Sequence, residues 1–201
     1  MYDRKDQVIT RSHELTKERQ KCVVLTLDDG PGRFLPQILD GLKMEEVPAV
    51  FFWQTRLLHP KRPWRRVLDE GHMIGSHSFR HPDLRKMEYH EQYDEIFKSK
   101  QKLEQTISQP IRYFRPPFGQ YNDITLEVLK ELDLTPVMWS IASMDWELKA
   151  HPEQIVSNVV LNLEEGAIIL LHELQQTLLV LPELIRQIRN AGYSFSLLPQ
   201  L

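Results

Sequence analysis

Short apolar runs alternate with longer amphipathic segments along the chain. The runs are of strand length and rich in β-branched and aromatic residues, a composition typical of buried strands. They cover residues 23–27, 49–53, 73–74, 111–114, 137–141, 167–171 and 193–197. This pattern predicts seven strands.

Between the runs, apolar residues recur at helical spacing. The spacing predicts helices around residues 38–42, 63–69, 93–107, 122–132, 152–163 and 182–190. Pro63, Pro152 and Pro182 stand where a helix begins, and Asn122 can accept a hydrogen bond from the first turn that follows it. Because strands that alternate with helices form parallel sheets, we expect an α/β fold. With about seven parallel strands, it would be a single-domain, distorted (β/α) barrel.

Composition narrows the class of protein. The 201 residues are 41% hydrophobic and 26% charged, which is typical of a globular protein with a sizeable core. We expect a polar N-terminal arm over residues 1–20 and one domain over residues 21–201. A net charge of -3 argues against a nucleic-acid partner. With Cys22 as its one cysteine, the chain can form no internal disulfide and no zinc finger.

The chain has no membrane span or export signal in its sequence as written. No apolar run approaches the ~18 residues that a membrane helix needs. The first twenty residues are polar and of mixed charge, without the apolar region of a signal peptide. Two locations stay open: the protein stays in the cytoplasm, as the sequence is written, or the sequence is a mature or trimmed form from which an export signal was removed.

Chemistry-bearing side chains follow five of the apolar runs. In a barrel of parallel strands, the carboxyl ends of the strands meet on one face, and active sites lie there. We therefore expect these side chains to share one site. They are Asp28, Asp29, His77, His81, Arg115, Asp145 and His172.

Two of the histidines have the spacing of a metal-binding pair. His77 and His81 are four residues apart, so on a helical turn they would share a face and could hold one ion. Such a pair is by itself also a common surface feature. With an aspartate from another strand end, it would make a three-ligand site with an open position, the pattern of a catalytic zinc. The ion would be Zn²⁺, with Co²⁺, Ni²⁺ or Mn²⁺ as alternatives that accept the same nitrogen and oxygen ligands.

At these residues the chain resembles the polysaccharide deacetylases of the NodB-homology type, carbohydrate esterase family 4, from about residue 22 to residue 198. The family motif T-F-D-D-G reads TLDDG at 26–30, and H-S/T-x-x-H reads HSFRH at 77–81. The motif R-x-P-F/Y-G reads RPPFG at 115–119, and L-x-H reads LLH at 170–172. Each motif alone is weak to moderate, but their joint occurrence in this order is a strong signal.

One motif departs from the family pattern. The family often shows D-x-x-D-W, and here Ala142 replaces the first aspartate while Asp145 and Trp146 remain. If the missing carboxylate only supports the loop, activity survives its loss. If it orients substrate or a catalytic partner, rate or specificity differs. Leu27 for phenylalanine, and Glu173 for the acid that usually follows the histidine, are milder changes.

The resemblance implies a role for each motif residue. Asp29, His77 and His81 would bind the metal, and Asp28 would be the general base on water activated by the ion. Arg115 would keep Asp28 ionised and oriented. His172 would be the general acid, with Asp145 raising its pKa. The implied substrate-binding residues are Trp146, Leu170, Pro117 and Phe118.

The expected function is metal-dependent removal of N-acetyl groups from glycans that contain N-acetylglucosamine. Peptidoglycan is the first expectation for the polymer, and chitin-like oligomers are the second. One alternative is hydrolysis of a small N-acyl or cyclic amide by the same site. The other is a catalytically impaired member that binds glycan without cleaving it, because Ala142 replaces a motif carboxylate.

Overall fold

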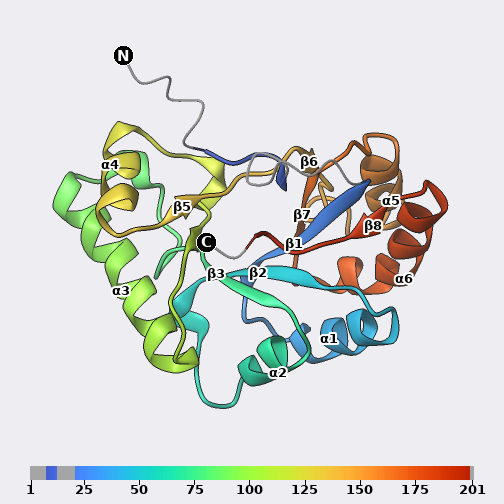
Figure 1. Ribbon diagram of the computed structural model, residues 1–201, viewed down its shortest axis with the longest axis horizontal. Helices are drawn as coiled ribbons and strands as arrows, with labels where there is room; N and C mark the ends of the chain where they lie inside the picture. The colour runs from blue at the N-terminus through green and yellow to red at the C-terminus, as the bar shows by residue number, and fades with distance from the viewer. Residues whose placement is uncertain (1–7, 13–20, 200–201) are drawn as a thin grey trace.

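A computed structural model describes residues 8–12 and 21–199 of the chain. Its centre is a curled sheet of parallel strands in the order β5-β4-β3-β2-β1-β7-β6, with β8 paired to β1 (Figure 1). The seven strands of this path form a half-barrel, which confirms the expected fold. The strands are β1 (Cys22–Gly30), β2 (Ala49–Trp53), β3 (Met73–Ser76), β4 (Tyr113–Phe114), β5 (Thr135–Pro136), β6 (Ile141–Ala142), β7 (Ile168–His172) and β8 (Ser194–Phe195).

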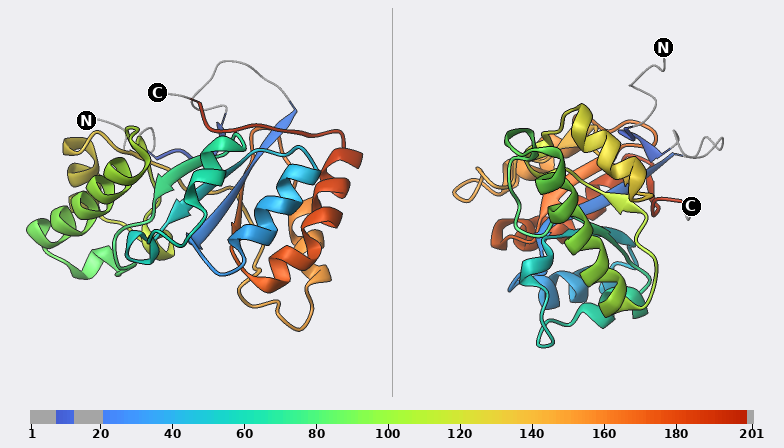
Figure 2. Two further views of the ribbon diagram at one scale, coloured as in Figure 1. Left: turned by 90° about the horizontal axis from the view of Figure 1, so that it is seen from below. Right: turned by 90° about the vertical axis from the view of Figure 1, so that its left-hand side faces the viewer.

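Helices cover the outside of the sheet. Figures 1 and 2 show α3 and α4 together at one end of the molecule, α5 and α6 together at the other, and α1 and α2 along the side between them. The helices are α1 (Leu35–Met44), α2 (Trp64–Asp69), α3 (Tyr89–Ile107), α4 (Asp123–Glu131), α5 (Glu153–Val160) and α6 (Gln175–Asn190), with short 3-10 turns η3 (Thr55–Leu57), η4 (Leu84–Lys86) and η5 (Pro117–Gly119).

Strand β1 is buried on both of its faces. Leu25 and Leu27 belong to the large cluster that joins the sheet to the helices. Val24, on the opposite face, belongs to a second cluster with Val50 and Phe52 from β2. A strand covered on both faces reads as a continuous apolar run, as residues 23–27 do.

A segment from the start of the chain links the end of β5 to the start of β7. Ile9 forms a bridge with Val137, just after β5, and Arg11 forms one with Ala167, just before β7. The Ser12 backbone N–H also donates to the Gly166 carbonyl oxygen at 2.8 Å. This part of the expected polar arm thus packs on the barrel, and the expected boundary after residue 20 stays a prediction. Residues 1–7 and 13–20 of the arm lie outside the described residues.

The prediction of one strand over residues 137–141 is wrong. Strand β5 ends at Pro136 and β6 begins at Ile141. Between them, the carbonyl oxygens of Val137 and Met138 accept hydrogen bonds from the Arg115 side chain, at 3.2 Å and 2.9 Å. The carbonyl groups of this segment thus bind a buried guanidinium, although the Val137 N–H still donates to the Phe114 carbonyl oxygen of β4 at 2.8 Å, and the run does not form one continuous strand.

The last helix starts earlier than predicted. Pro182 is not its first turn, because α6 begins at Gln175 and contains the proline. A proline can lie inside a helix at the cost of one backbone hydrogen bond, so the start signal was misleading. Helix α3 also begins one turn early, at Tyr89, where Glu88 and Glu91 form a capping box.

The predicted cap at Asn122 is confirmed, since its side-chain oxygen accepts from the Thr125 backbone N–H at 3.0 Å.

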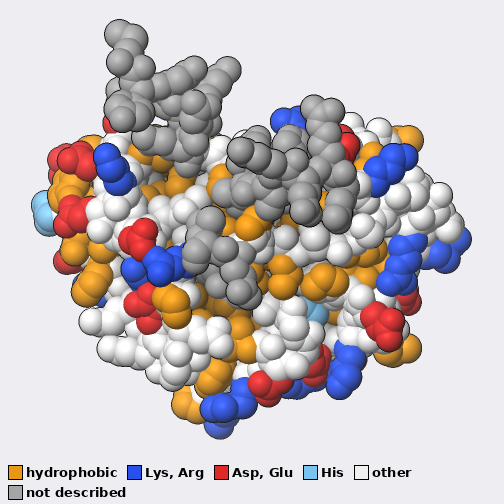
Figure 3. All heavy atoms as spheres, viewed as in Figure 1, with side chains coloured by type: hydrophobic (Ala, Val, Ile, Leu, Met, Phe, Trp, Pro, Cys, Tyr) orange, Lys and Arg blue, Asp and Glu red, His pale blue; other side chains and the backbone are white. Residues whose placement is uncertain are grey.

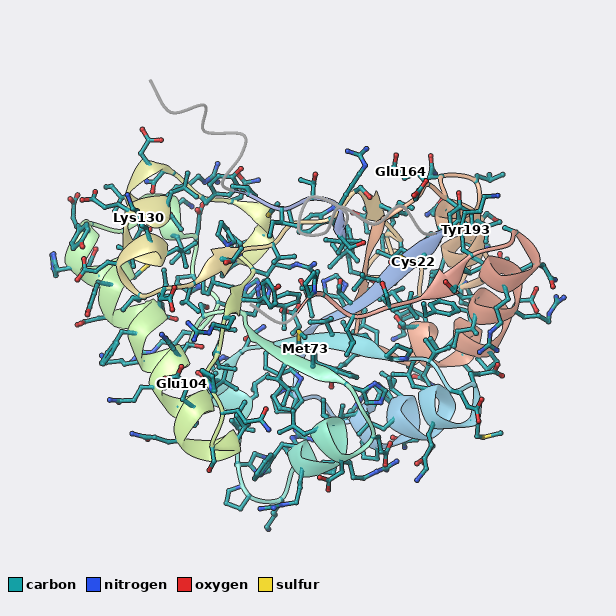
Figure 4. All side chains as sticks on the ribbon, in the orientation of Figure 1. Cys22, Met73, Glu104, Lys130, Glu164 and Tyr193 are labelled. Carbon is teal, nitrogen blue, oxygen red and sulfur yellow. The ribbon has the colours of Figure 1, made fainter. Side chains whose placement is uncertain are left out.

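Strand direction places the amino and carboxyl edges of the sheet on opposite sides. Figure 4 labels Cys22 and Met73, which begin β1 and β3. In the left view of Figure 2, β1 starts near the upper edge and its arrowhead lies low.

On the face shown in Figure 3, acidic and basic side chains are interspersed over the outer helices. Among the described residues, no helix combines the length and apolar character needed to cross a bilayer.

Candidate functional site

The end of β1 turns two adjacent carboxylates toward the same side. Successive side chains of a regular strand point to opposite faces. Here the β1–β2 register shifts between Asp28 and Gly30, and Asp29 has a φ of 68°. A bulge with a left-handed residue re-aims a side chain at the cost of local strain. As a result, Asp28 Oδ2 lies 3.8 Å and Asp29 Oδ1 lies 3.7 Å from His77 Nε2.

The two histidines meet across a loop. The predicted helical turn is wrong, because Ser78 and His81 both have a φ of 66° in an irregular segment after β3. His77 Nδ1 lies 2.7 Å from the Arg115 carbonyl oxygen, to which its N–H donates. In a neutral imidazole this hydrogen bond places the ring proton on Nδ1, so Nε2 is the nitrogen that can bind a metal. The Nε2 atoms of His77 and His81 lie 3.2 Å apart.

The spacing of three side chains fits one divalent cation. Within the described part of the chain, Asp29, His77 and His81 form a group whose ligand atoms all lie within 4.8 Å of one another. Asp29 Oδ1 is 3.7 Å from His77 Nε2 and 3.4 Å from His81 Nε2. A tetrahedral Zn²⁺ with bonds near 2.0–2.1 Å separates its ligands by about 3.3 Å. The three separations match that value to within a few tenths of an ångström, so the residues fit such an ion.

The protonation states suit metal binding as well. Burial alone would raise the pKa of Asp29, but His77, the Gln54 amide, His172 and His81 together lower it. Burial, aided by the charge of His77, lowers the pKa of His81. A deprotonated carboxylate and a neutral imidazole are the forms that bind metal.

On one side of this cluster lies a buried ion pair. Arg115 is fully buried and Asp28 is 2% exposed. Arg115 Nη1 donates to Asp28 Oδ1 at 2.7 Å and to Thr26 Oγ1 at 2.6 Å. Burial lowers the pKa of the Arg115 guanidinium, and the charge of Asp28 opposes that effect. The pair occupies one carboxylate oxygen and leaves Asp28 Oδ2 facing the cluster.

On the other side lies a second acid with a histidine. His172 Nδ1 is 2.7 Å from Asp145 Oδ1, and His172 Nε2 is 3.9 Å from Asp29 Oδ2. Burial would lower the pKa of His172, but the hydrogen bond and charge of Asp145, with the charges of Asp28 and Asp29, raise it above its usual value. Thr177, at the start of α6, donates its hydroxyl to Asp145 Oδ2 at 2.5 Å.

Aromatic side chains stand at the opening of the site. Trp146 is 42% exposed, and its ring meets the edge of His172 at a centroid distance of 5.2 Å. Phe118 is 61% exposed and packs against His81 at 4.4 Å. Leu170 and Pro117 are buried. Each of the four predicted substrate-binding residues thus belongs to the motif loops or strand ends at this edge.

The polar residues expected at the site therefore lie together at the carboxyl edge of the sheet. Three further polar residues at this edge were not predicted from the sequence. Gln54 donates to Asp29 Oδ1 at 2.7 Å, and it directly follows β2, so the strand-end rule could have found it. Glu173 and Thr177 also contact this edge. Glu173 was noted only as a sequence change, and no sequence signal marks Thr177.

The half-barrel has the fold of the (β/α)-barrel carbohydrate esterases, such as a family 4 carbohydrate esterase from Streptomyces lividans, with which it superimposes with a TM-score of 0.83 at 27% identity, covering 90% of this chain and 95% of that one. Within that class, the chain belongs to the polysaccharide deacetylase family, whose model matches residues 16–137. A peptidoglycan-N-acetylglucosamine deacetylase of Bacillus cereus is 34% identical over 187 residues, which are 89% of this chain and 67% of that protein. A chitooligosaccharide deacetylase of Bradyrhizobium sp. is 33% identical over 201 residues, with 90% of each chain covered.

Solved structures agree on the fold. A crystal structure of a peptidoglycan N-acetylglucosamine deacetylase superimposes with a TM-score of 0.86 at 31% identity, covering 96% of this chain and 91% of that one. A CE4 family pseudoenzyme from Bacillus anthracis superimposes with a TM-score of 0.80 at 28% identity, covering 88% of this chain. This chain spans 63% of the pseudoenzyme's length.

Proposed function

We propose that this protein is a metal-dependent deacetylase that removes N-acetyl groups from glycans containing N-acetylglucosamine. The observation that supports this most strongly is the order of groups along one edge. The metal-fitting cluster of Asp29, His77 and His81 has the Asp28–Arg115 pair on one side and the His172–Asp145 pair on the other. Family membership and relatives that are peptidoglycan and chitooligosaccharide deacetylases support the substrate class.

Each group has a task in hydrolysis of an amide, which is a poor electrophile with a poor leaving group. A divalent cation held by Asp29, His77 and His81 would lower the pKa of water to about 7 and polarise the acyl carbonyl. Asp28 accepts the proton of the attacking water through Oδ2, because Arg115 holds Oδ1. A carboxylate is too weak a base to deprotonate bulk water usefully, so it needs a water acidified in this way.

His172 is the proton donor for the amine that leaves. Asp28 and His172 are register partners on β1 and β7, so base and acid stand beside each other at the edge of the sheet. Asp145 orients the imidazole through Nδ1 and leaves Nε2 free to donate when the C–N bond breaks. The products are acetate and a free amino sugar.

The aromatic rim suits a substrate longer than a small amide. Trp146 and Leu170 would line an apolar slot for the acetyl methyl group, and Phe118 with Pro117 would contact the sugar on the opposite side. Since Trp146 and Phe118 remain 42% and 61% exposed, they offer surface to sugar units beyond the one that reacts. A panel of small N-acyl and cyclic amides tested against oligosaccharides distinguishes this proposal from the small-amide alternative.

The direct test is acetate release from N-acetylglucosamine oligomers by protein loaded with Zn²⁺ or Co²⁺. The Asp28→Asn variant is expected to lose about 10²–10⁴-fold in rate, as enzymes do when a positioned base is removed. Asp40→Asn, on the exposed face of α1, is the matched control and is expected to keep full activity. Equal acetate release by wild type and Asp28→Asn would refute the assignment.

A second candidate is glycan binding without cleavage. It is favoured by Ala142, which is the register partner of Leu170 at the proposed slot, and by the similarity to a CE4 family pseudoenzyme. Metal-loaded protein that binds N-acetylglucosamine oligomers in calorimetry yet releases no acetate would support it.

A further inference from the structure

Glu173 is a buried carboxyl that the proposed chemistry does not use. It directly follows His172 at the end of β7 and is 6% exposed. Its Oε1 accepts from the Trp53 indole N–H at 2.9 Å, and its Oε2 accepts from the Gly32 backbone N–H at 2.5 Å. The side chain thus links the end of β7 to the end of β2 and to the loop after β1.

The Gly32 backbone N–H and the Trp53 indole N–H can only donate hydrogen bonds. The side chain at position 173 must therefore present two acceptor atoms at once. A carboxyl group does so, because each of its two oxygens can accept a hydrogen bond. A glutamine would place its NH₂ group against either the Trp53 indole N–H or the Gly32 N–H, leaving one buried donor unsatisfied. The geometry therefore selects a carboxylate at this position rather than any polar side chain.

The loop is built around this carboxylate. A Cβ atom added to Gly30 would overlap Glu173 Oε1 and come within 2.7 Å of Trp53 Nε1. A Cβ on Gly32 would lie 3.0 Å from Glu173 Oε2. The absence of a side chain at both glycines leaves the space that the carboxylate fills. A larger residue at either position would crowd the Glu173 side chain.

This contact acts next to the strained residue of the cluster. Asp29, with its φ of 68°, directly precedes Gly30. Glu173 accepts from the backbone N–H of Gly32, which is three residues after Asp29. On the opposite side, Gln54 holds the same turn by donating from its backbone N–H to the Gly30 carbonyl oxygen at 2.9 Å. A backbone in a sparsely populated conformation persists only where its surroundings hold it.

We propose that Glu173 is a positioning residue for the metal cluster, which holds the loop after β1 so that Asp29 faces His77 and His81. It acts through Gly32 and Trp53 and touches no substrate. The inference deepens the proposed function and rests on it only through the metal site. Loss of a hydrogen-bonded support behind a metal ligand typically costs about 10–100-fold in metal affinity.

The test compares Zn²⁺ affinity, measured by competition with a chromophoric chelator, in two variants whose folding is checked by circular dichroism. Glu173→Gln keeps the shape of the side chain and loses one acceptor. Trp53→Phe removes one of the two hydrogen bonds and changes no charge. Both are expected to bind Zn²⁺ about 10–100-fold more weakly than wild type. Glu183→Gln, on the exposed side of α6, is the control and is expected to bind normally.

Normal Zn²⁺ affinity in folded Glu173→Gln overturns the proposal. A loss in Glu173→Gln without a loss in Trp53→Phe also overturns it, because the effect is then one of charge and not of position. If Glu173→Gln does not fold, Glu173→Asp takes its place, since it keeps both acceptors on a stem one methylene shorter, and the same affinity loss is expected.

Acetate release by wild type separates this proposal from the proposed function. An active wild type whose Glu173→Gln variant binds Zn²⁺ normally keeps the function and overturns the positioning role. A wild type that binds Zn²⁺ but releases no acetate, with weaker binding in Glu173→Gln and Trp53→Phe, upholds the positioning role without the function.

Discussion

Arg115→Met isolates the buried ion pair that holds Asp28. The guanidinium is fully buried and donates to the side chains of Thr26 and Asp28 and to the carbonyl oxygens of Val137 and Met138. Methionine fills much of the same volume but has no donor. The substitution leaves the Asp28 carboxylate, 2% exposed, without a cationic partner.

The cost follows from that burial. Removing one partner of a buried pair typically costs about 3–5 kcal/mol, because the remaining charge is uncompensated. Unfolding entropy is about 2.1 cal/mol/K per residue, so a chain of 201 residues has about 0.4 kcal/mol/K in total. The loss therefore corresponds to a fall in Tm of about 7–12 °C.

Thermal unfolding followed by circular dichroism, in the presence of a chelator, measures this shift. The matched control is Arg112→Met, three residues earlier, where the ion pair with Asp133 is 40% and 79% exposed and is expected to contribute at most about 1 kcal/mol. The double variant Arg115→Met with Asp28→Asn has no buried charge at this position. Its loss of stability should therefore be smaller than the sum of the losses in the two single variants. A Tm shift no larger than that of Arg112→Met, or strict additivity, would refute the reasoning.

Two further expectations concern pH. Burial raises the pKa of Glu173 from 4.5 to about 7, against the opposing effects of its two donors and of Arg62, and with a smaller contribution from Asp29. As the pH rises, the unfolded chain loses the Glu173 proton at a lower pH than the folded chain does. Metal-free wild type should therefore lose about 3 kcal/mol of its free energy of unfolding between pH 4.5 and pH 7. Denaturant titrations of Glu173→Gln over the same range should show a smaller loss. Asp145 raises the pKa of His172, so Asp145→Asn should move the alkaline limb of the rate profile to lower pH; an unmoved limb would exclude His172 as the acid.

The arrangement of the sheet could be predicted from the sequence because it depends on a repeated pattern. The apolar run at 23–27 is continuous because both faces of β1 are covered, and each predicted run overlaps a parallel strand, although the run at 137–141 does so only at Ile141. The side of the sheet that carries the site follows from strand direction alone. That is why Asp28 and His172, far apart in sequence, were expected near each other and are register partners.

What could not be predicted depends on single long-range contacts. The apolar run at 137–141 has the composition of a strand, but Arg115 takes up two of its carbonyl groups. The bulge at Asp29 has no local sequence signal beyond the glycine that follows it. Glu173 appeared as a mild exchange of one acid for another, because its role depends on donors from two other strand ends.

The central claim divides the two acids of β1 between metal binding and chemistry, and one paired measurement tests it most directly. Zn²⁺ affinity and acetate release from N-acetylglucosamine oligomers are measured together in Asp28→Asn and Asp29→Asn. Asp29→Asn is expected to lose more Zn²⁺ affinity than the about 10–100-fold that loss of a supporting hydrogen bond costs. Asp28→Asn is expected to bind Zn²⁺ like wild type and to release almost no acetate. If both variants lose Zn²⁺ alike, or if Asp28→Asn keeps wild-type activity, the account is contradicted.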